Sequence, residues 1–182
     1  MEQDIGKILI SERRLQHRIR ELGAEISRDY AGKEPLFVGI LKGCFVFMGD
    51  LMRHVSGYCA VDFMAVSSYG NRSITTGAVK INKDLSEDIE NRHVIIVEDI
   101  LDSGVTLNYL MQYLQVRRPA SMEIVTLLDK PSRRQKPVQA KYVGFEVPDK
   151  FVVGYGLDYA ERYRNLPYIG VLKPEIYENE NG

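Results

Sequence analysis

A group of polar residues follows an apolar run in the middle of the chain. The run spans residues 94–97, and the polar residues directly after it are Glu98, Asp99, Asp102, Ser103 and Thr106. Hydroxyl groups and free backbone amides at the start of a helix bind anions such as phosphate, and Gly104 lets the backbone approach such a ligand closely. Carboxylates beside a phosphate site are compatible when Mg²⁺ joins them, because Mg²⁺ bridges carboxylates to substrate oxygens. This pattern predicts a ligand with a phosphate at one end and metal-binding hydroxyls or a diphosphate at the other.

Capping is the alternative interpretation of the same residues. An isolated pair such as Glu98 and Asp99 commonly ends a strand, and Ser103 or Thr106 alone commonly caps a helix. Five polar groups in this order between a buried strand and a helix favour the ligand site. The hydroxyls can serve both purposes.

Helical and strand patterns alternate around this segment. Apolar spacing predicts helices near 11–32, 44–55 and 107–114, and short apolar runs predict strands near 35–41, 61–68, 94–97, 124–128, 142–145, 151–153 and 168–172. The alternation predicts an α/β fold with a mostly parallel central sheet flanked by helices. Because ligands bind beyond the carboxyl ends of such strands, the loops after Leu41, Val97 and Leu128 are expected to carry the chemistry. The small polar stretch 69–76 lacks periodicity and predicts a lid loop.

Composition narrows the class of protein. The chain has 182 residues, 24 Lys+Arg, 25 Asp+Glu and two Cys, which predicts one globular domain with reduced thiols. A net charge of −1 argues against nucleic acid and anionic membrane as partners. The N-terminus lacks the pattern of a secretory signal, and the most apolar segment, 36–49, contains Lys42 and is too short to span a bilayer. We therefore expect a cytoplasmic protein.

The segment 94–106 resembles the phosphoribosyl-diphosphate signature of the type I phosphoribosyltransferases. Four further stretches support the resemblance, which runs from about residue 5 to about 172, and the last two of them single out the 6-oxopurine branch of that family. These stretches are Leu41-Lys42-Gly43, Ser67-Ser68-Tyr69-Gly70, 127–134 and 151–164. The resemblance implies the type I fold as one domain over 1–182, with a core at about 35–145, a hood from the N-terminal and C-terminal segments and a lid loop at about 68–80.

The resemblance also implies an activity in purine salvage. The 5-phosphoribosyl group of phosphoribosyl diphosphate would pass to N9 of hypoxanthine or guanine, giving IMP or GMP and pyrophosphate. The reaction would depend on Mg²⁺, and the protein would be a homodimer or homotetramer.

Residue roles come from the same resemblance. Asp102 would be the general base, accepting a proton near purine N7, and Lys130 would read the purine O6 and disfavour the 6-amino group of adenine. The diphosphate would be bound by Lys42, Gly43, Ser68, Tyr69 and Arg164. The ribose and 5′-phosphate would be bound by Glu98, Asp99, Asp102, Ser103, Gly104, Val105 and Thr106. The purine would be bound by Lys130, Phe151, Val152 and Asp158, and the metal by Glu98, Asp99 and Asp158.

Simpler interpretations stand beside these roles. A lysine within an apolar run, such as Lys42, commonly extends to solvent, and an aromatic residue in a short strand, such as Phe151, commonly packs in a core. We expect a solvated basic face for Arg133, Arg134, Lys136 and Lys141. At the level of function, the alternatives are a nucleotide-sensing regulator with this fold and a transferase for another nucleobase, such as xanthine.

Overall fold

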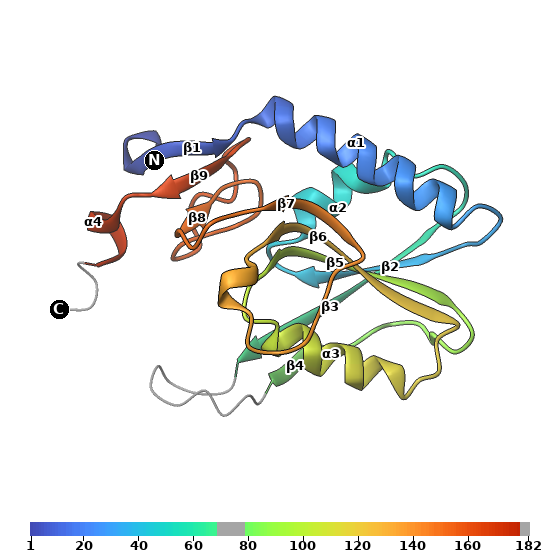
Figure 1. Ribbon diagram of the computed structural model, residues 1–182. Helices are drawn as coiled ribbons and strands as arrows, with labels where there is room; N and C mark the ends of the chain where they lie inside the picture. The colour runs from blue at the N-terminus through green and yellow to red at the C-terminus, as the bar shows by residue number, and fades with distance from the viewer. Residues whose placement is uncertain (69–78, 179–182) are drawn as a thin grey trace.

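The computed structural model describes residues 1–68 and 79–178, and its largest element is a twisted sheet (Figure 1). The strand order in this sheet is β4-β3-β2-β5-β6-β7. The strands are β2 (Leu36–Leu41), β3 (Ala60–Ser68), β4 (Val79–Lys83), β5 (His93–Leu101), β6 (Ser121–Asp129) and β7 (Tyr142–Glu146). All neighbouring pairs are parallel except β3 with the edge strand β4. The carboxyl ends of five strands therefore lie at one edge of the sheet.

Helices cover both faces of the main sheet. The helices α1 (Glu12–Asp29) and α2 (Phe45–Met52) lie on one face, and α3 (Val105–Gln115) lies on the other (Figure 1). The sequence dictates this for α1, whose apolar side chains recur every three or four residues and are fully buried: Leu15, Ile19, Leu22 and Ile26. Each such side chain stabilises the fold by about 1.5–3 kcal/mol when removed from water.

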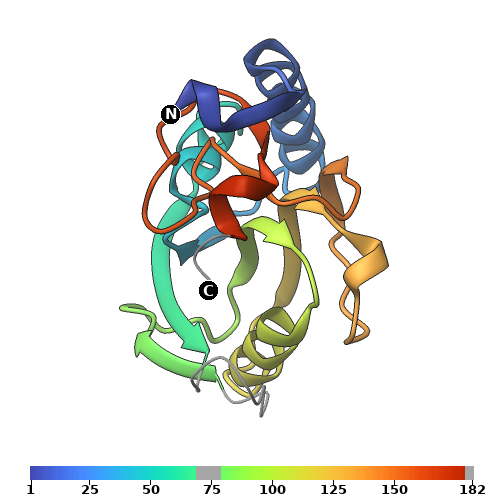
Figure 2. The ribbon, with the colours of Figure 1, turned by 90° about the vertical axis from the view of Figure 1, so that its left-hand side faces the viewer.

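A second, smaller sheet joins the two ends of the chain. It has the antiparallel order β1-β9-β8, formed by β1 (Ile5–Ile10), β9 (Ile169–Leu172) and β8 (Val152–Val153). It lies on the side to which the strands of the main sheet point, and Figure 2 shows it from its outer side. Three single-turn helices complete the described structure: η1 (Glu2–Asp4), η2 (Pro131–Arg133) and α4 (Pro174–Tyr177).

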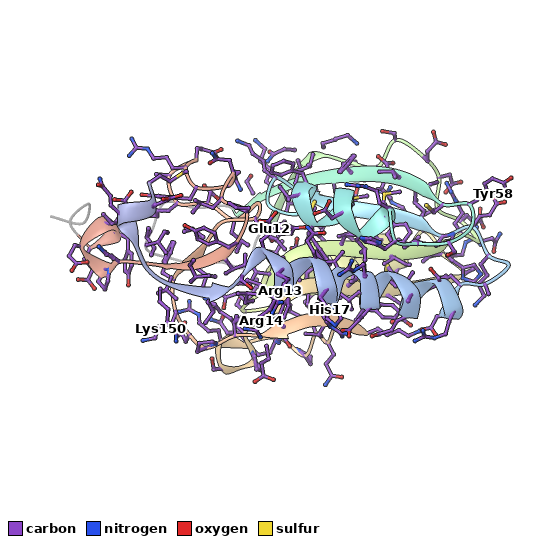
Figure 3. All side chains as sticks on the ribbon, turned by 90° about the horizontal axis from the view of Figure 1, so that it is seen from above. Glu12, Arg13, Arg14, His17, Tyr58 and Lys150 are labelled. Carbon is purple, nitrogen blue, oxygen red and sulfur yellow. The ribbon has the colours of Figure 1, made fainter. Side chains whose placement is uncertain are left out.

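The expected α/β fold is confirmed, and several local predictions need correction. The first helix, on which Glu12, Arg13, Arg14 and His17 are exposed (Figure 3), ends at Asp29 rather than near Gly32. The second helix is limited to α2. In β3, the apolar Val61 is 43% exposed, whereas the acidic Asp62 is buried. Asp62 is satisfied there, because its carboxylate accepts hydrogen bonds from the backbone amides of Phe63 and Ser86.

No sequence pattern predicted β1 or β4. The face of β1 is largely exposed, and the expected lid falls mostly on residues 69–78, which lie outside the described residues. Among the residues that the structure describes, no helix is both long and apolar enough to cross a membrane.

Candidate active site

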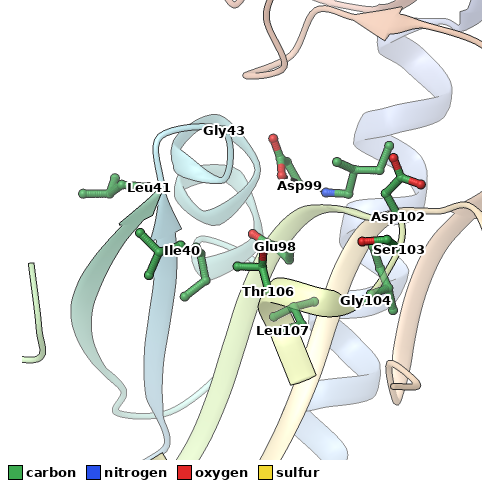
Figure 4. A pocket seen from close by; sticks show the side chains of 13 residues that line it. Ile40, Leu41, Gly43, Glu98, Asp99, Asp102, Ser103, Gly104, Thr106 and Leu107 are labelled. Atoms are coloured by element: carbon green, nitrogen blue, oxygen red, sulfur yellow. Dashed lines mark hydrogen bonds between the residues drawn. The ribbon is translucent and has the colours of Figure 1, made fainter. Parts of the chain in front are cut away.

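A pocket of about 260 Å³ lies beyond the carboxyl ends of β2 and β5. Figure 4 shows Ile40, Leu41 and Gly43 on one side, with the segment Glu98–Leu107 on the other. The lining includes six of the residues assigned to the ribose and 5′-phosphate: Glu98, Asp99, Asp102, Ser103, Gly104 and Thr106. The local sequence that suggested the site therefore folds around a single cavity.

The acid pair at the end of β5 is electrostatically costly. Glu98 is only 9% exposed, and burial, with the neighbouring Asp99, raises its pKa well above the usual range. Burial likewise raises the pKa of Asp99 to about 6, although Asp99 Oδ1 accepts a hydrogen bond of 2.8 Å from Ile100 N. Within the described residues, no salt bridge joins either carboxylate to a basic side chain. A cation arriving with the ligand would offset this cost.

The turn from β5 to α3 presents an anion site. Gly104 precedes the helix with a φ of +76°, a left-handed conformation that glycine adopts readily. The α3 N-terminus then directs backbone amides and the Ser103 and Thr106 hydroxyls toward the pocket. Ser103 Oγ accepts only a long hydrogen bond of 3.4 Å, from Val105 N. The turn is thus formed by local backbone geometry and keeps donors for a phosphate.

The loop after β2 packs tightly against Asp99. The Leu41–Lys42 peptide is cis. A Cβ placed on Gly43 would lie 1.6 Å from Asp99 Oδ2, and one placed on Gly156 would lie 2.2 Å from the Gly43 carbonyl oxygen. Only glycine fits at either position without displacement. Sequence reasoning assigned no role to Gly156, although it stands in a stretch that carried the family resemblance.

Two cationic side chains border this loop. Lys42 is exposed and pairs with Glu161 at 3.0 Å, which lowers the pKa of that carboxyl. Arg164 is mostly buried: Nη2 lies 3.0 Å from Asp158 Oδ1, and Nη1 donates to the Gly156 carbonyl at 2.8 Å. Arg164 Nε is buried and has no hydrogen-bond partner in the described parts of the chain.

A second pocket, of about 400 Å³, adjoins the first through Asp102 and Ile100. It contains every residue expected at the purine: Lys130, Phe151, Val152 and Asp158. Lys130 is 7% exposed and donates to the Lys150 carbonyl at 2.6 Å, and burial lowers its pKa.

Aromatic residues form another wall of this pocket. The ring of Phe151 stacks on Tyr177 of α4, with centroids 4.9 Å apart. Leu157 also lines the pocket. Sequence reasoning missed Tyr177 and Leu157, because no local pattern brings the end of the chain to this place.

The expectation of a solvated basic face is wrong for Arg134, whereas Arg133 and Lys141 are exposed but each pair with a carboxylate. Arg133 lines the second pocket and lies 3.1 Å from Asp102. Arg134 is largely buried, pairs with Asp129 and donates to the Asp102 carbonyl. Lys141 pairs with Asp29. Two of the carboxylate partners, Asp102 and Asp29, belong to distant segments of the chain, so the basic run alone could not predict these pairings.

The structure describes only some of the remaining predicted site residues. The backbone of Ser68 pairs with Val79 at the end of β3, and Tyr69 lies outside the described residues. Val105 opens α3.

Comparison with known proteins decides the family. Residues 7–160 match the model of the phosphoribosyl transferase domain. The chain belongs to the phosphoribosyltransferase family. The hypoxanthine-guanine phosphoribosyltransferase of Bacillus subtilis is 57% identical over 98% of this chain and 99% of its own length. The enzyme of the same name from Staphylococcus aureus is 53% identical over 98% of this chain and all of its own length.

Solved structures agree with this assignment. A crystal structure of a hypoxanthine phosphoribosyltransferase from Staphylococcus aureus superposes with a TM-score of 0.94, covering 97% of this chain and 96% of that one at 53% identity. The type I phosphoribosyltransferase fold is therefore confirmed. The first pocket is lined by six of the seven residues that the resemblance assigns to the ribose and 5′-phosphate, and the second by all four that it assigns to the purine.

Proposed function

We propose that this phosphoribosyltransferase transfers the 5-phosphoribosyl group of phosphoribosyl diphosphate to N9 of hypoxanthine or guanine, with Mg²⁺, giving IMP or GMP and pyrophosphate. One observation carries the proposal. Among the described residues, two buried side-chain atoms lack hydrogen-bond partners: Asp102 Oδ1, an acceptor that Arg133 Nε approaches to 3.1 Å only as an ion pair, and Arg164 Nε, a donor. Unsatisfied buried groups are costly, and they occur where a ligand completes them. The reaction needs an acceptor for a purine proton and a donor for the departing pyrophosphate.

The first pocket suits the phosphoribosyl diphosphate. The turn at the start of α3 would bind the 5′-phosphate through Ser103, Gly104, Val105 and Thr106, and Glu98 and Asp99 would bind the ribose hydroxyls. Donors on the opposite side would stabilise the charge that develops on the leaving pyrophosphate. These diphosphate-binding residues are Lys42, Gly43, Ser68, Tyr69 and Arg164.

The donor set around Glu98 and Asp99 fits Mg²⁺. Both groups are oxygen ligands in a setting that disfavours their charge. In the described parts of the chain, no group of three or more His, Cys, Asp or Glu side chains could hold a metal, so substrate oxygens would complete the coordination. Asp158 is the remaining metal candidate and is already paired with Arg164. Bound Mg²⁺ would neutralise charge on the diphosphate and the acid pair.

The second pocket suits a 6-oxopurine. Lys130 is a buried donor that would meet O6, and the 6-amino group of adenine would bring a second donor to the same place. Phe151 would stack on the base, the Val152 backbone would meet its edge, and Asp158 would lie near the guanine edge. Asp102, shared by both pockets, would take the proton released as N9 bonds to C1′.

We extend the proposal to the organisation of the protein. The main sheet would be the core of a single domain, the second sheet its hood, and the segment 68–80 its lid. The protein would act in the cytoplasm as a homodimer or homotetramer, with no nucleic acid or membrane partner.

The test is product formation by the purified protein. Phosphoribosyl diphosphate is incubated with hypoxanthine, guanine, xanthine or adenine, with Mg²⁺ or with a chelator, and nucleotides are separated by chromatography. We expect IMP and GMP, no AMP, and no product after chelation. Absence of turnover with both hypoxanthine and guanine would overturn the proposal. Tight binding of phosphoribosyl diphosphate without turnover would favour a nucleotide-sensing regulator, and product with xanthine alone would favour the other transferase.

A further inference from the structure

Arg133 lies between two carboxylates at the purine pocket. Its Nε is 3.1 Å from Asp102 Oδ1, at the end of β5, and its Nη1 is 3.5 Å from Asp149 Oδ1, in the loop after β7. Arg133 itself lines the pocket, together with both acids. One guanidinium thus connects two segments that line the purine pocket.

The contact between Arg133 and Asp102 is an ion pair that forms no hydrogen bond to the carboxylate oxygen. Asp102 Oδ1 is buried and, within the described residues, accepts no hydrogen bond, although Arg133 Nε is close. Arg133 therefore attracts the carboxylate by charge, and the lone pairs of Asp102 Oδ1 are not engaged in a hydrogen bond. The neighbouring Arg134 donates to the Asp102 backbone carbonyl at 2.9 Å, so consecutive arginines hold the side chain and the backbone of one residue.

The contact with Asp149 reaches the other functional group of the pocket. Asp149 directly precedes Lys150, whose carbonyl accepts the hydrogen bond from Lys130 Nζ. Lys130 in turn directly precedes the η2 turn that ends with Arg133. Arg133 therefore links the proposed proton acceptor to the loop that fixes the proposed O6 donor.

We propose that Arg133 is a positioning residue, which holds the Asp102 carboxylate in line with the purine and sets its distance from Lys130. The inference rests on the proposed function. Asp102 has a free torsion on either side of its Cβ, and a group displaced by about 1 Å can lose about 100-fold in rate. The planar fork of an arginine can reach two carboxylates at once, whereas a lysine offers a single point charge.

The test compares Arg133→Ala, Arg133→Lys and a matched control in steady-state kinetics. The control is Arg118→Ala, which removes a side chain that is 78% exposed and pairs with Glu90. Arg118 lies between α3 and β6, and Glu90 lies shortly before β5, so this pair stands at the amino ends of the strands, away from both pockets. We expect Arg133→Ala to lower kcat/KM for hypoxanthine by about 10-fold to 100-fold, with KM for phosphoribosyl diphosphate unchanged. Arg133→Lys should recover part of the loss, and the control should match the wild type.

A double-variant measurement separates positioning from a general structural effect. In an Asp102→Asn background the carboxylate is gone, so adding Arg133→Ala should cost much less than it does alone. An equal loss in both backgrounds, or no loss in either, refutes the inference. If Arg133→Ala does not fold, it is replaced by Arg133→Gln in both the wild-type and the Asp102→Asn background. Glutamine keeps a hydrogen-bond donor without the charge. Failure of the wild type to form IMP or GMP would instead refute the proposed function.

Discussion

Replacing Gly43 with alanine tests the close contact between the loop after β2 and the acid pair. The added Cβ would lie 1.6 Å from Asp99 Oδ2 and 2.5 Å from its Cγ. Carbon atoms in contact are normally about 3.5–4.0 Å from their neighbours, so either the carboxylate or the loop must move by about 2 Å. The carboxylate is displaced more easily than the backbone of the loop, because it is the end of a side chain.

The displacement has two measurable costs. Turning Asp99 breaks the hydrogen bond that its Oδ1 accepts from Ile100 N, and bonds to charged groups contribute about 1.5–3 kcal/mol. For a domain of this length, each kcal/mol shifts Tm by about 2–4 °C, so we expect a fall of roughly 3–12 °C. Moving a ligand-binding carboxylate by more than 1 Å should also lower kcat/KM for phosphoribosyl diphosphate by about 100-fold.

Gly49→Ala in α2 is the matched control. Nothing lies within 4 Å of a Cβ added there, and glycine within a helix is less stable than alanine by about 0.5–1 kcal/mol. Thermal unfolding by circular dichroism should therefore show a small rise in Tm for this variant, with unchanged kinetics. If the Gly43 variant matches the Gly49 variant in both Tm and kcat/KM, the contact has no functional consequence and the reasoning is wrong.

Three further predictions concern single side chains. Asp102→Asn should lower kcat by about 10²-fold to 10⁴-fold with little change in either KM, because it removes a proton acceptor; unchanged kcat in steady-state assays contradicts that role. Lys130→Ala should raise KM for hypoxanthine and leave the Kd of phosphoribosyl diphosphate unchanged in titration calorimetry, and an equal loss of both contradicts base reading. Burial opposes the charge of Asp62, but hydrogen bonds from Phe63, Ser86 and Glu87 outweigh it and lower its pKa. Its stabilising effect is therefore present above the unfolded pKa of about 3.9 and lost as pH falls through the folded pKa. Urea unfolding should show a larger difference between wild type and Asp62→Asn at neutral pH than in acid, and an equal difference at both contradicts the sign.

Local sequence was sufficient to predict the site where the structural elements and the functional residues follow one another along the chain. The strand β5, the Gly104 turn and α3 follow one another without interruption, so the order of residue types predicted both the elements and the anion site. The stripe of α1 was predictable for the same reason, because its period is set by helix geometry.

Contacts between segments that are distant in the sequence could not be predicted from local sequence patterns. The strand β1 pairs with β9, more than 150 residues later, and its exposed face gives no alternation to recognise. The approach of Gly156 to Gly43 and the pairing of Arg133 with Asp102 likewise depend on loops that meet only in the folded chain. The error for the basic run has this origin, since sequence shows the charge of a residue but not its partner.

The pairing of β1 with β9 has a consequence for biosynthesis. On the ribosome, β2, β3, β5 and the phosphate-binding turn are made well before residues 169–172 exist. The first strand must wait, unpaired, for nearly the whole chain to be made. The nascent protein would therefore form its phosphate-binding turn first. The second sheet, which contributes to the purine pocket, would form last, as the final step of folding. A chain that stops before β9 would lack the strand with which both β1 and β8 pair.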